Sequence, residues 1–102
     1  TNEWLNNALT EKPAGVFTSS GSMHGGQEST LLTMAIPLLH HGMLLTGIPF
    51  SEKELSTTRE GGTPYGPSHV SDEKTRKILS PDEVSLARAL GKRISRIAKQ
   101  LN

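Results

Sequence analysis

The chain has 102 residues, of which 33% are hydrophobic and 4% aromatic, so little apolar surface is available for a core. Its formal net charge of +1 gives no general attraction to nucleic acid, and the lack of cysteine excludes disulfides, thiolate catalysis and cysteine-based zinc sites. The sequence has no run of about 18 apolar residues and no leader-like start, so we expect a cytoplasmic protein without a membrane span.

The chain opens with a segment that has the spacing of the last turns of a helix. Its apolar residues recur at helical intervals and precede a proline that prevents the helix from continuing: Trp4, Leu5, Ala8, Leu9 and then Pro13. Residues 14–18 follow as a short β-branched and aromatic run, which predicts a buried strand.

This strand leads into a loop of small residues, 19–26, before a long apolar segment. In an open α/β sheet, the loop at the carboxyl end of a strand is where ligands bind, and glycines let the backbone turn sharply beside a flat or anionic group. Serine hydroxyls and backbone N–H groups would be the donors, and His24 is either a lid residue or simply exposed. The alternative is a tight strand-to-helix turn without a ligand.

Residues 31–39 predict a helix that is buried nearly all round, because almost no polar face interrupts its apolar residues. We expect the sheet to cover one side and another subunit the other. Pro37 should kink this helix, and Gly42 should end it in a left-handed conformation. His40 and His41 point about 100° apart on a helix, so they cannot easily chelate one metal ion, and we expect no metal site.

Residues 43–48 form a continuous apolar run, which predicts a central parallel strand covered on both faces and ended by Pro49. The next segment, 50–79, has little periodicity and is rich in glycine, proline and charge, so we expect a functional loop or an interface arm. Its turn at 61–66 should be rigid, should present Tyr65 outward and has no evident role within one domain.

The run from Ser80 to Glu83 predicts the start of the last helix, with an N-cap serine, a first-turn proline and a capping-box glutamate. The apolar residues beyond it recur every three or four positions as a core-facing stripe: Val84, Ala87, Leu90, Ile94, Ile97 and Leu101. Basic residues occupy other positions and predict a solvated face rather than a nucleic-acid site, since no aromatic residues are interleaved: Arg88, Lys92, Arg93, Arg96 and Lys99.

Three separated stretches, 16–28, 37–43 and 61–66, together resemble one family. They resemble, in this order, the carboxyl-terminal half of a WrbA-type NAD(P)H:quinone oxidoreductase, a flavodoxin-like protein that carries FMN. The resemblance implies a flavodoxin-like α/β fold with a doubly wound parallel sheet, of which residues 1–102 supply the last two strands and their helices. Nothing here matches the family's first strand with its phosphate-cradling loop, nor the loop after its third strand.

The resemblance also implies two-electron reduction of quinones, with NADH or NADPH as hydride donor and no side chain acting as acid or base in the hydride step. It implies homotetramers whose active sites include more than one subunit, partly through the turn at 61–66. Trp4 would line the cavity near the quinone; the alternative is that it only packs against its neighbours. His41 would have a structural role. The implied FMN contacts are Ser19, Ser20, Gly21, Ser22, Met23, His24, Gly25 and His40.

Two other functions use the same residues. A hydrolase that uses Ser19 or Ser20 with His24 or His40 would need a nucleophile elbow and an orienting acid, and the sequence shows neither. A non-catalytic flavodoxin-like interaction module would use the glycine-rich loop and the turn at 61–66 for oligomer contacts only. Because the phosphate loop is absent, we expect the chain by itself to bind FMN weakly or not at all and to be inactive.

Overall fold

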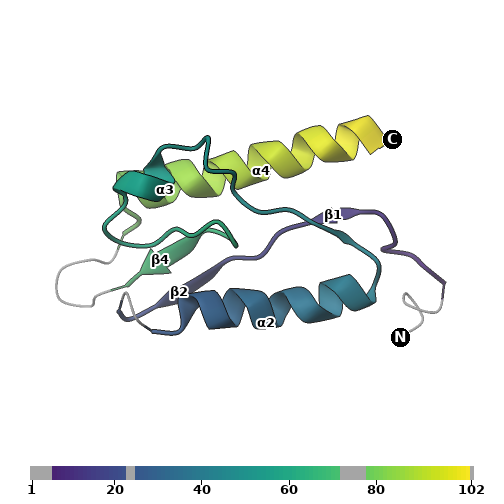
Figure 1. Ribbon diagram of the computed structural model, residues 1–102, viewed down its shortest axis with the longest axis horizontal. Coiled ribbons are helices and arrows are strands. Elements are labelled where there is room, and N and C mark those ends of the chain that lie inside the picture. Colours follow the sequence, from purple (N-terminus) through teal and green to yellow (C-terminus); the bar gives the residue numbers. More distant parts are fainter. Residues whose placement is uncertain (1–5, 23–24, 72–77, 102) are drawn as a thin grey trace.

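The computed structural model of the chain describes residues 6–22, 25–71 and 78–101. Short strands and helices alternate along it (Figure 1): β1 (Pro13–Ala14), β2 (Thr18–Ser20), α2 (Gln27–His40), β3 (Leu44–Leu45), α3 (Glu54–Thr57), β4 (Ser68–Val70) and α4 (Pro81–Leu101). The helix predicted over residues 1–9 is not seen in its described part. Residues 6–11 form turns, because Asn7 and Glu11 adopt positive φ angles of 56° and 65° that a right-handed helix excludes.

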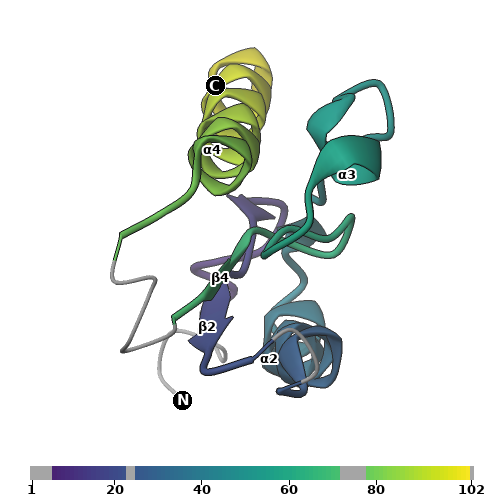
Figure 2. The ribbon, with the colours of Figure 1, turned by 90° about the vertical axis from the view of Figure 1, so that its left-hand side faces the viewer.

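Two long helices, α2 and α4, lie on opposite sides of the strands, and the short α3 lies beside α4 (Figure 2). The strands form two parallel pairs, β1 with β3 and β2 with β4. Parallel pairs require crossover connections, and the helical segments between the strands supply them. The predicted α/β class is therefore confirmed.

The single strand predicted over 14–18 is divided into β1 and β2. Its neighbour along the sheet comes from two separate segments, so the Thr46 N–H bonds the Ala14 carbonyl while the Thr18 N–H bonds the Pro67 carbonyl. Between these pairings the turn at 61–66 approaches the strand. A Cβ at Gly66 would lie 2.2 Å from the carbonyl oxygen of Val16, so only glycine fits there.

The strand predicted over 43–48 is shorter and less covered than expected. Regular pairing is confined to β3, and Leu44 and Leu45 are both 42% exposed, whereas Thr46 and Ile48 beyond them are buried. The prediction of a central strand covered on both faces is thus wrong for this chain, because β1 is its only strand partner among the described residues.

The segment 50–79 is more than a loop, because it contains α3 and β4. Its turn at 61–66 packs against the chain itself: Gly61 and Gly66 are buried, and a Cβ at Gly47 would lie 2.3 Å from the Pro64 carbonyl oxygen. The expectation that this turn has no role within the domain is therefore wrong. Tyr65 is 47% exposed, as the predicted outward position requires.

Helix α2 runs through Pro37 to His40 and ends as predicted at Gly42, which has a φ of 76°. The Met43 N–H bonds the Leu38 carbonyl and the Gly42 N–H bonds the Leu39 carbonyl, the pattern of a Schellman motif. The predicted kink at Pro37 stays a prediction.

Within the chain, this helix is covered on one side only, and the predicted cover of its other side by another subunit stays a prediction. Only Gln27 and Leu31 are buried, while three apolar residues on another side are 50% to 64% exposed: Leu32, Ile36 and Leu39. The strands of this chain reach only one side of the helix.

Helix α4 begins with the predicted capping box. The Ser80 hydroxyl accepts the Glu83 N–H at 3.2 Å, and the Glu83 carboxylate accepts the Ser80 N–H at 2.8 Å. The core-facing stripe is shifted from the prediction, because Leu86 is fully buried and Ala87 is exposed. Leu86 and Leu90 pack with Ile48, and partly buried side chains surround them: Leu55 and Ile94.

Candidate functional site

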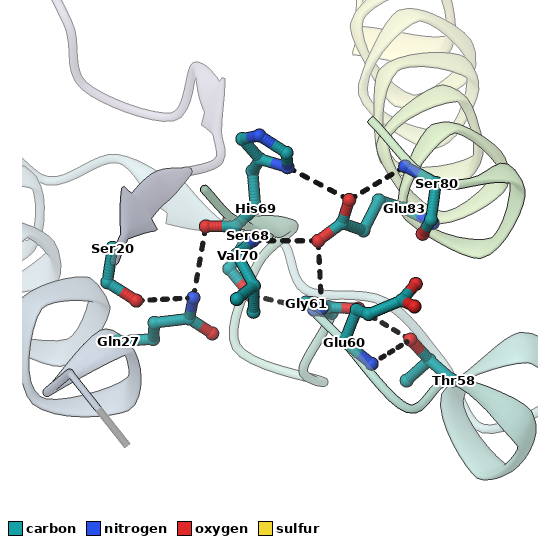
Figure 3. Close-up of polar contacts among 11 residues, drawn as sticks. Ser20, Gln27, Thr58, Glu60, Gly61, Ser68, His69, Val70, Ser80 and Glu83 are labelled. Atoms are coloured by element: carbon teal, nitrogen blue, oxygen red, sulfur yellow. Dashed lines mark hydrogen bonds and ion pairs between the residues drawn. The ribbon is translucent and has the colours of Figure 1, made fainter. Parts of the chain in front are cut away.

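The candidate site lies where β2 and β4 end side by side (Figure 3). Ser20 is paired with Val70, and the Ser71 N–H donates to the Ser20 carbonyl at 2.7 Å. The glycine-rich loop leaves this edge and enters α2. The structure thus places the predicted ligand loop at the carboxyl ends of two parallel strands, where open α/β sheets bind ligands.

Hydrogen bonds inside the loop use one of the predicted ligand contacts. The Ser20 hydroxyl donates to the Ser22 carbonyl at 2.5 Å and accepts the Gln27 side-chain N–H at 2.8 Å. Gln27, which is 7% exposed, also donates to the His69 carbonyl at 3.2 Å and so ties α2 to both strands. Ser20 therefore shapes the loop, whereas Ser19 and Ser22 are exposed.

Two glycines fix the path of the loop. A Cβ at Gly25 would lie 2.7 Å from the Ser20 Cβ, and Gly26 has a φ of 78° at the N-cap of α2. Gly21 is less restricted, since the nearest atom to its hypothetical Cβ is the Ser71 carbonyl oxygen at 3.8 Å. Met23 and His24, like Trp4, lie outside the described residues.

The Glu83 carboxylate joins the segments next to this edge through hydrogen bonds (Figure 3). Its carboxylate accepts the backbone N–H groups of Gly61 at 2.9 Å, Val70 at 2.8 Å and Ser80 at 2.8 Å, and it pairs with Nδ1 of His69 at 2.9 Å. Burial raises the pKa of Glu83, but the hydrogen bonds from Ser80, Val70, His69 and Gly61 outweigh it and lower the pKa to about 2. Glu83 is therefore an ionised structural anchor at neutral pH.

His40 and His41 lie at the far end of α2 from the loop. The helix has 14 residues, so at about 1.5 Å per residue the two ends are roughly 20 Å apart. His40 is exposed, and its ring meets that of His41 edge-on, with centroids 6.3 Å apart. The structure does not bring His40 to the loop of its own chain. Within the described residues, no group of three or more potential ligands is arranged for a metal ion.

Similarity to known proteins adds to this geometry. No protein-family model matches the chain. Over 100 residues it is 44% identical to an NAD(P)H dehydrogenase (quinone) of Methanosarcina barkeri, an alignment that covers 96% of this chain and 48% of that protein. The chain is thus similar, over nearly its whole length, to part of a protein named NAD(P)H dehydrogenase (quinone).

Further relatives agree with this result. A Methanosarcina acetivorans protein of the same name is 44% identical over 96% of this chain and 48% of its own length, and one from Syntrophobacter fumaroxidans is 43% identical over 96% and 49%. The resemblance predicted from the motifs is confirmed. The chain spans about half the length of the curated relatives it matches.

Sequence reasoning did not anticipate Gln27 and His69, or the full reach of Glu83. Gln27 gave one signal, as a long polar side chain that opens the helix directly after two glycines. No signal in the sequence indicated the contacts of His69 or the distant contacts of Glu83. His69 lies 14 residues before Glu83 in the chain, and Gly61 lies 22 residues before it.

The His69–Glu83 pair shows an acid that orients a histidine, but this histidine is His69 rather than His24 or His40 of the hydrolase alternative. Ser19 is paired with His69 in the ladder, but no hydrogen bond joins their side chains within the described residues. A nucleophile needs such a bond to its base, so the structure does not favour a hydrolase.

One of the five basic residues predicted to be solvated is not. Arg93 is partly buried, and its guanidinium donates to the Gly47 carbonyl at 2.7 Å, which ties α4 to the segment after β3. Among the helices of the described ranges, none is long and apolar enough to cross a bilayer.

Proposed function

We propose that this chain is the carboxyl-terminal half of a flavodoxin-like, WrbA-type enzyme that reduces quinones with NAD(P)H and uses FMN. The observation that carries the proposal is the 44% identity, over 96% of the chain, to a protein named NAD(P)H dehydrogenase (quinone). Parallel strands with helices on both sides are compatible with part of a doubly wound sheet.

The glycine-rich loop fits the edge of a flavin ring. Gly25 leaves no room for a side chain, the Ser19 and Ser22 hydroxyls are exposed, and the N-cap of α2 at Gly26 makes no side-chain hydrogen bond. Backbone N–H groups and hydroxyls at this edge suit the carbonyl oxygens and nitrogens of an isoalloxazine. FMN, when bound, supplies hydride transfer from NAD(P)H to the quinone. The loop residues would bind and orient the ring.

Acid–base chemistry is not expected from the residues around this loop. Both oxygens of Glu83 are occupied by donors, and its pKa of about 2 keeps it ionised. Positioning and electrostatics would carry the reaction, as hydride transfer through a cofactor requires no protein acid or base.

His40 would contact the cofactor only from a second copy of the chain. The roughly 20 Å length of α2 separates it from the loop of its own chain. The exposed apolar residues of α2 provide a surface for such a copy: Leu32, Ile36 and Leu39. We therefore keep a homotetramer with shared sites as part of the proposal, with Trp4 walling the quinone cavity and the enzyme located in the cytoplasm.

The alternative of a non-catalytic interaction module loses one of its two supports. It assigned the turn at 61–66 to oligomer contacts only, but Gly61 and Gly66 pack against the strands of their own chain. The glycine-rich loop remains, and it is accounted for by cofactor binding.

A hybrid protein tests the proposal. This chain would replace the matching half of the Methanosarcina barkeri relative, so that the other half supplies the missing part of the fold. We expect a yellow protein that bleaches with NADH and is reoxidised by benzoquinone, whereas the 102-residue chain alone should show neither submicromolar FMN binding nor activity. A hybrid that folds cooperatively but retains no flavin would contradict the proposal. The same assay with NADH and NADPH determines the preferred donor.

A Gly25→Val substitution in the hybrid locates the flavin. Its side chain would overlap Ser20, so we expect flavin retention to fall by at least tenfold while the fold is kept. Gly91→Ala is the matched control, because nothing lies within 4 Å of a Cβ at Gly91.

A further inference from the structure

The outer face of α4 carries a row of cations. Four exposed residues at intervals of three or four form what we name the basic crest: Arg88, Lys92, Arg96 and Lys99. At 3.6 residues per turn they occupy an arc of about 80° and extend roughly 17 Å along the helix. The buried residues Leu86 and Leu90 lie on the opposite side. The crest therefore faces away from the strands and from whatever else packs on them.

The charge of the crest is opposed in part by Glu52 and Glu54, which line a hollow together with Arg88 and Lys92, but its own helix carries no acidic residue beyond Glu83. After Glu83 the sequence has five basic residues and no acidic residue, which leaves six basic and ten acidic residues for the rest of the chain. Within the described residues, the four crest side chains form no ion pair. The chain is thus electrostatically divided, with its positive potential concentrated on one helix face.

We propose that the basic crest docks the protein peripherally on an anionic lipid surface. Four cations that lie within an arc of about 80° on one helix can approach a plane together. Lysine and arginine near an anionic leaflet each add attraction that falls off within a Debye length. The crest itself has no apolar side chain, so the binding would be superficial and sensitive to salt.

A nucleic-acid partner fits the surface less well. The hollow that flanks the crest, of about 530 Å³, is lined by Glu52 and Glu54 as well as by Arg88 and Lys92. A polyanion that follows the helix flank would meet these carboxylates, whereas a plane that touches the crest would not. No aromatic residue lies on α4 to stack with bases.

Docking itself depends on charge alone, whereas its use rests on the proposed function. Long-chain quinones dissolve in the bilayer, so a quinone reductase held at the lipid surface would meet its substrate there. Vesicle binding is measured without quinone, cofactor or NAD(P)H, and its failure is therefore distinct from failure of the proposed reaction.

The test is cosedimentation of the full 102-residue chain with vesicles. We expect binding to vesicles of three parts phosphatidylcholine to one part phosphatidylglycerol at low salt, release at about 0.3 M NaCl, and no binding to pure phosphatidylcholine. At about fivefold per cation, removing three should weaken binding by roughly a hundredfold. The variant is Arg88→Gln with Lys92→Gln and Arg96→Gln.

A matched control removes the same charge from exposed positions elsewhere and should bind within twofold of the native chain: Lys12→Gln, Lys53→Gln and Arg59→Gln. Circular dichroism checks that both variants keep their helices. If the crest variant unfolds, Arg88→Lys with Arg96→Lys provides the second test, because it keeps the charge and should bind like the native chain.

Three results would overturn the proposal. These are equal binding to both kinds of vesicle, equal losses from the crest variant and its control, and displacement of the chain from anionic vesicles by duplex DNA at equal phosphate concentration. The last result would assign the crest to nucleic acid.

Discussion

The surroundings of Glu83 and the outer side of α2 differ in how far their side chains find partners within the chain. On one side, Glu83 joins β4, the turn at 61–66 and the start of α4, and all its hydrogen-bonding capacity is met within the chain. On the other, α2 exposes an apolar face, which we define as Leu32, Ile36 and Leu39, each at least 50% exposed. Within the described residues, the chain thus satisfies the buried Glu83 carboxylate by itself, whereas it leaves the apolar face of α2 exposed.

The reason is that a buried charge without hydrogen bonds costs more free energy than an exposed apolar side chain does. A buried carboxylate without partners would cost several kcal/mol, so the segments that supply its partners must be in the same chain or arrive with it. An exposed leucine forgoes about 1.5 to 3 kcal/mol of burial, but exposure leaves no group unpaired. The Glu83 side is therefore expected to be sensitive to substitution and the apolar face tolerant.

The largest expected effect is at Glu83. Replacing Glu83 by Gln removes the charge and turns one acceptor into a donor that faces backbone N–H groups, so the free energy of unfolding should fall by about 4 kcal/mol. Urea titration followed by circular dichroism measures it. The control is Asp82→Asn on the same turn, whose exposed carboxylate makes only a 3.5 Å contact with Thr57 and should matter little. An equal loss of unfolding free energy in the Glu83 and Asp82 variants would contradict the special role of Glu83.

Acid should reproduce part of this loss in the native chain. The pKa of Glu83 is lowered from 4.5 to about 2 in the folded state, so its contribution is complete above pH 4.5 and is lost as the pH falls toward 2. A shift of this size corresponds to about 3 kcal/mol. Urea midpoints measured at intervals from pH 6 to pH 2 should fall in the native chain. The Glu83→Gln variant should lack this dependence, and a parallel fall in both would assign it to other groups.

Helix α2 allows the comparison within one element. Leu31 is fully buried, so Leu31→Ala should reduce the free energy of unfolding by about 3 kcal/mol, whereas Ile36→Ala, at 64% exposure, should change it by less than about 0.5 kcal/mol. In the hybrid protein, Ile36→Ala should instead weaken assembly, as measured by light scattering across a dilution series. A stability loss at Ile36 in the chain alone would show that the face is already covered.

The smallest expected effect separates two arginines of α4. Arg93→Gln removes the 2.7 Å hydrogen bond to the Gly47 carbonyl and should cost about 1 kcal/mol, while Arg88→Gln on the exposed crest should cost almost nothing. Thermal unfolding of the two variants side by side measures the difference. Equal unfolding temperatures of the two variants would contradict a stabilising role of Arg93 and would favour the solvated position that the sequence predicts.

Much of the local structure could be predicted because its signals are short. The Ser80–Glu83 capping box, the stop at Gly42 and the glycine-rich loop at the end of a strand each depend on residues within a few positions of one another. The predicted core stripe of α4 is confirmed at Leu90 and Ile94 but names Ala87 where the structure buries Leu86. Its rule of spacing cannot tell Leu86 from Ala87 without knowing where Ile48 lies.

Sequence alone is enough to predict the α/β class, the stop of α2 at Gly42, the start of α4 at its capping box and the position of the glycine-rich loop, because backbone propensities and caps act within one or two turns. Only the tertiary structure decided that β4 exists, that β1 and β2 are separate, and that Glu83 binds Gly61 across 22 residues. It also decided that His40 lies far from the loop. These features depend on which distant segments come into contact. Such contacts are set by side-chain packing and by the hydrogen bonding of buried polar groups, and neither produces a periodic pattern in the sequence.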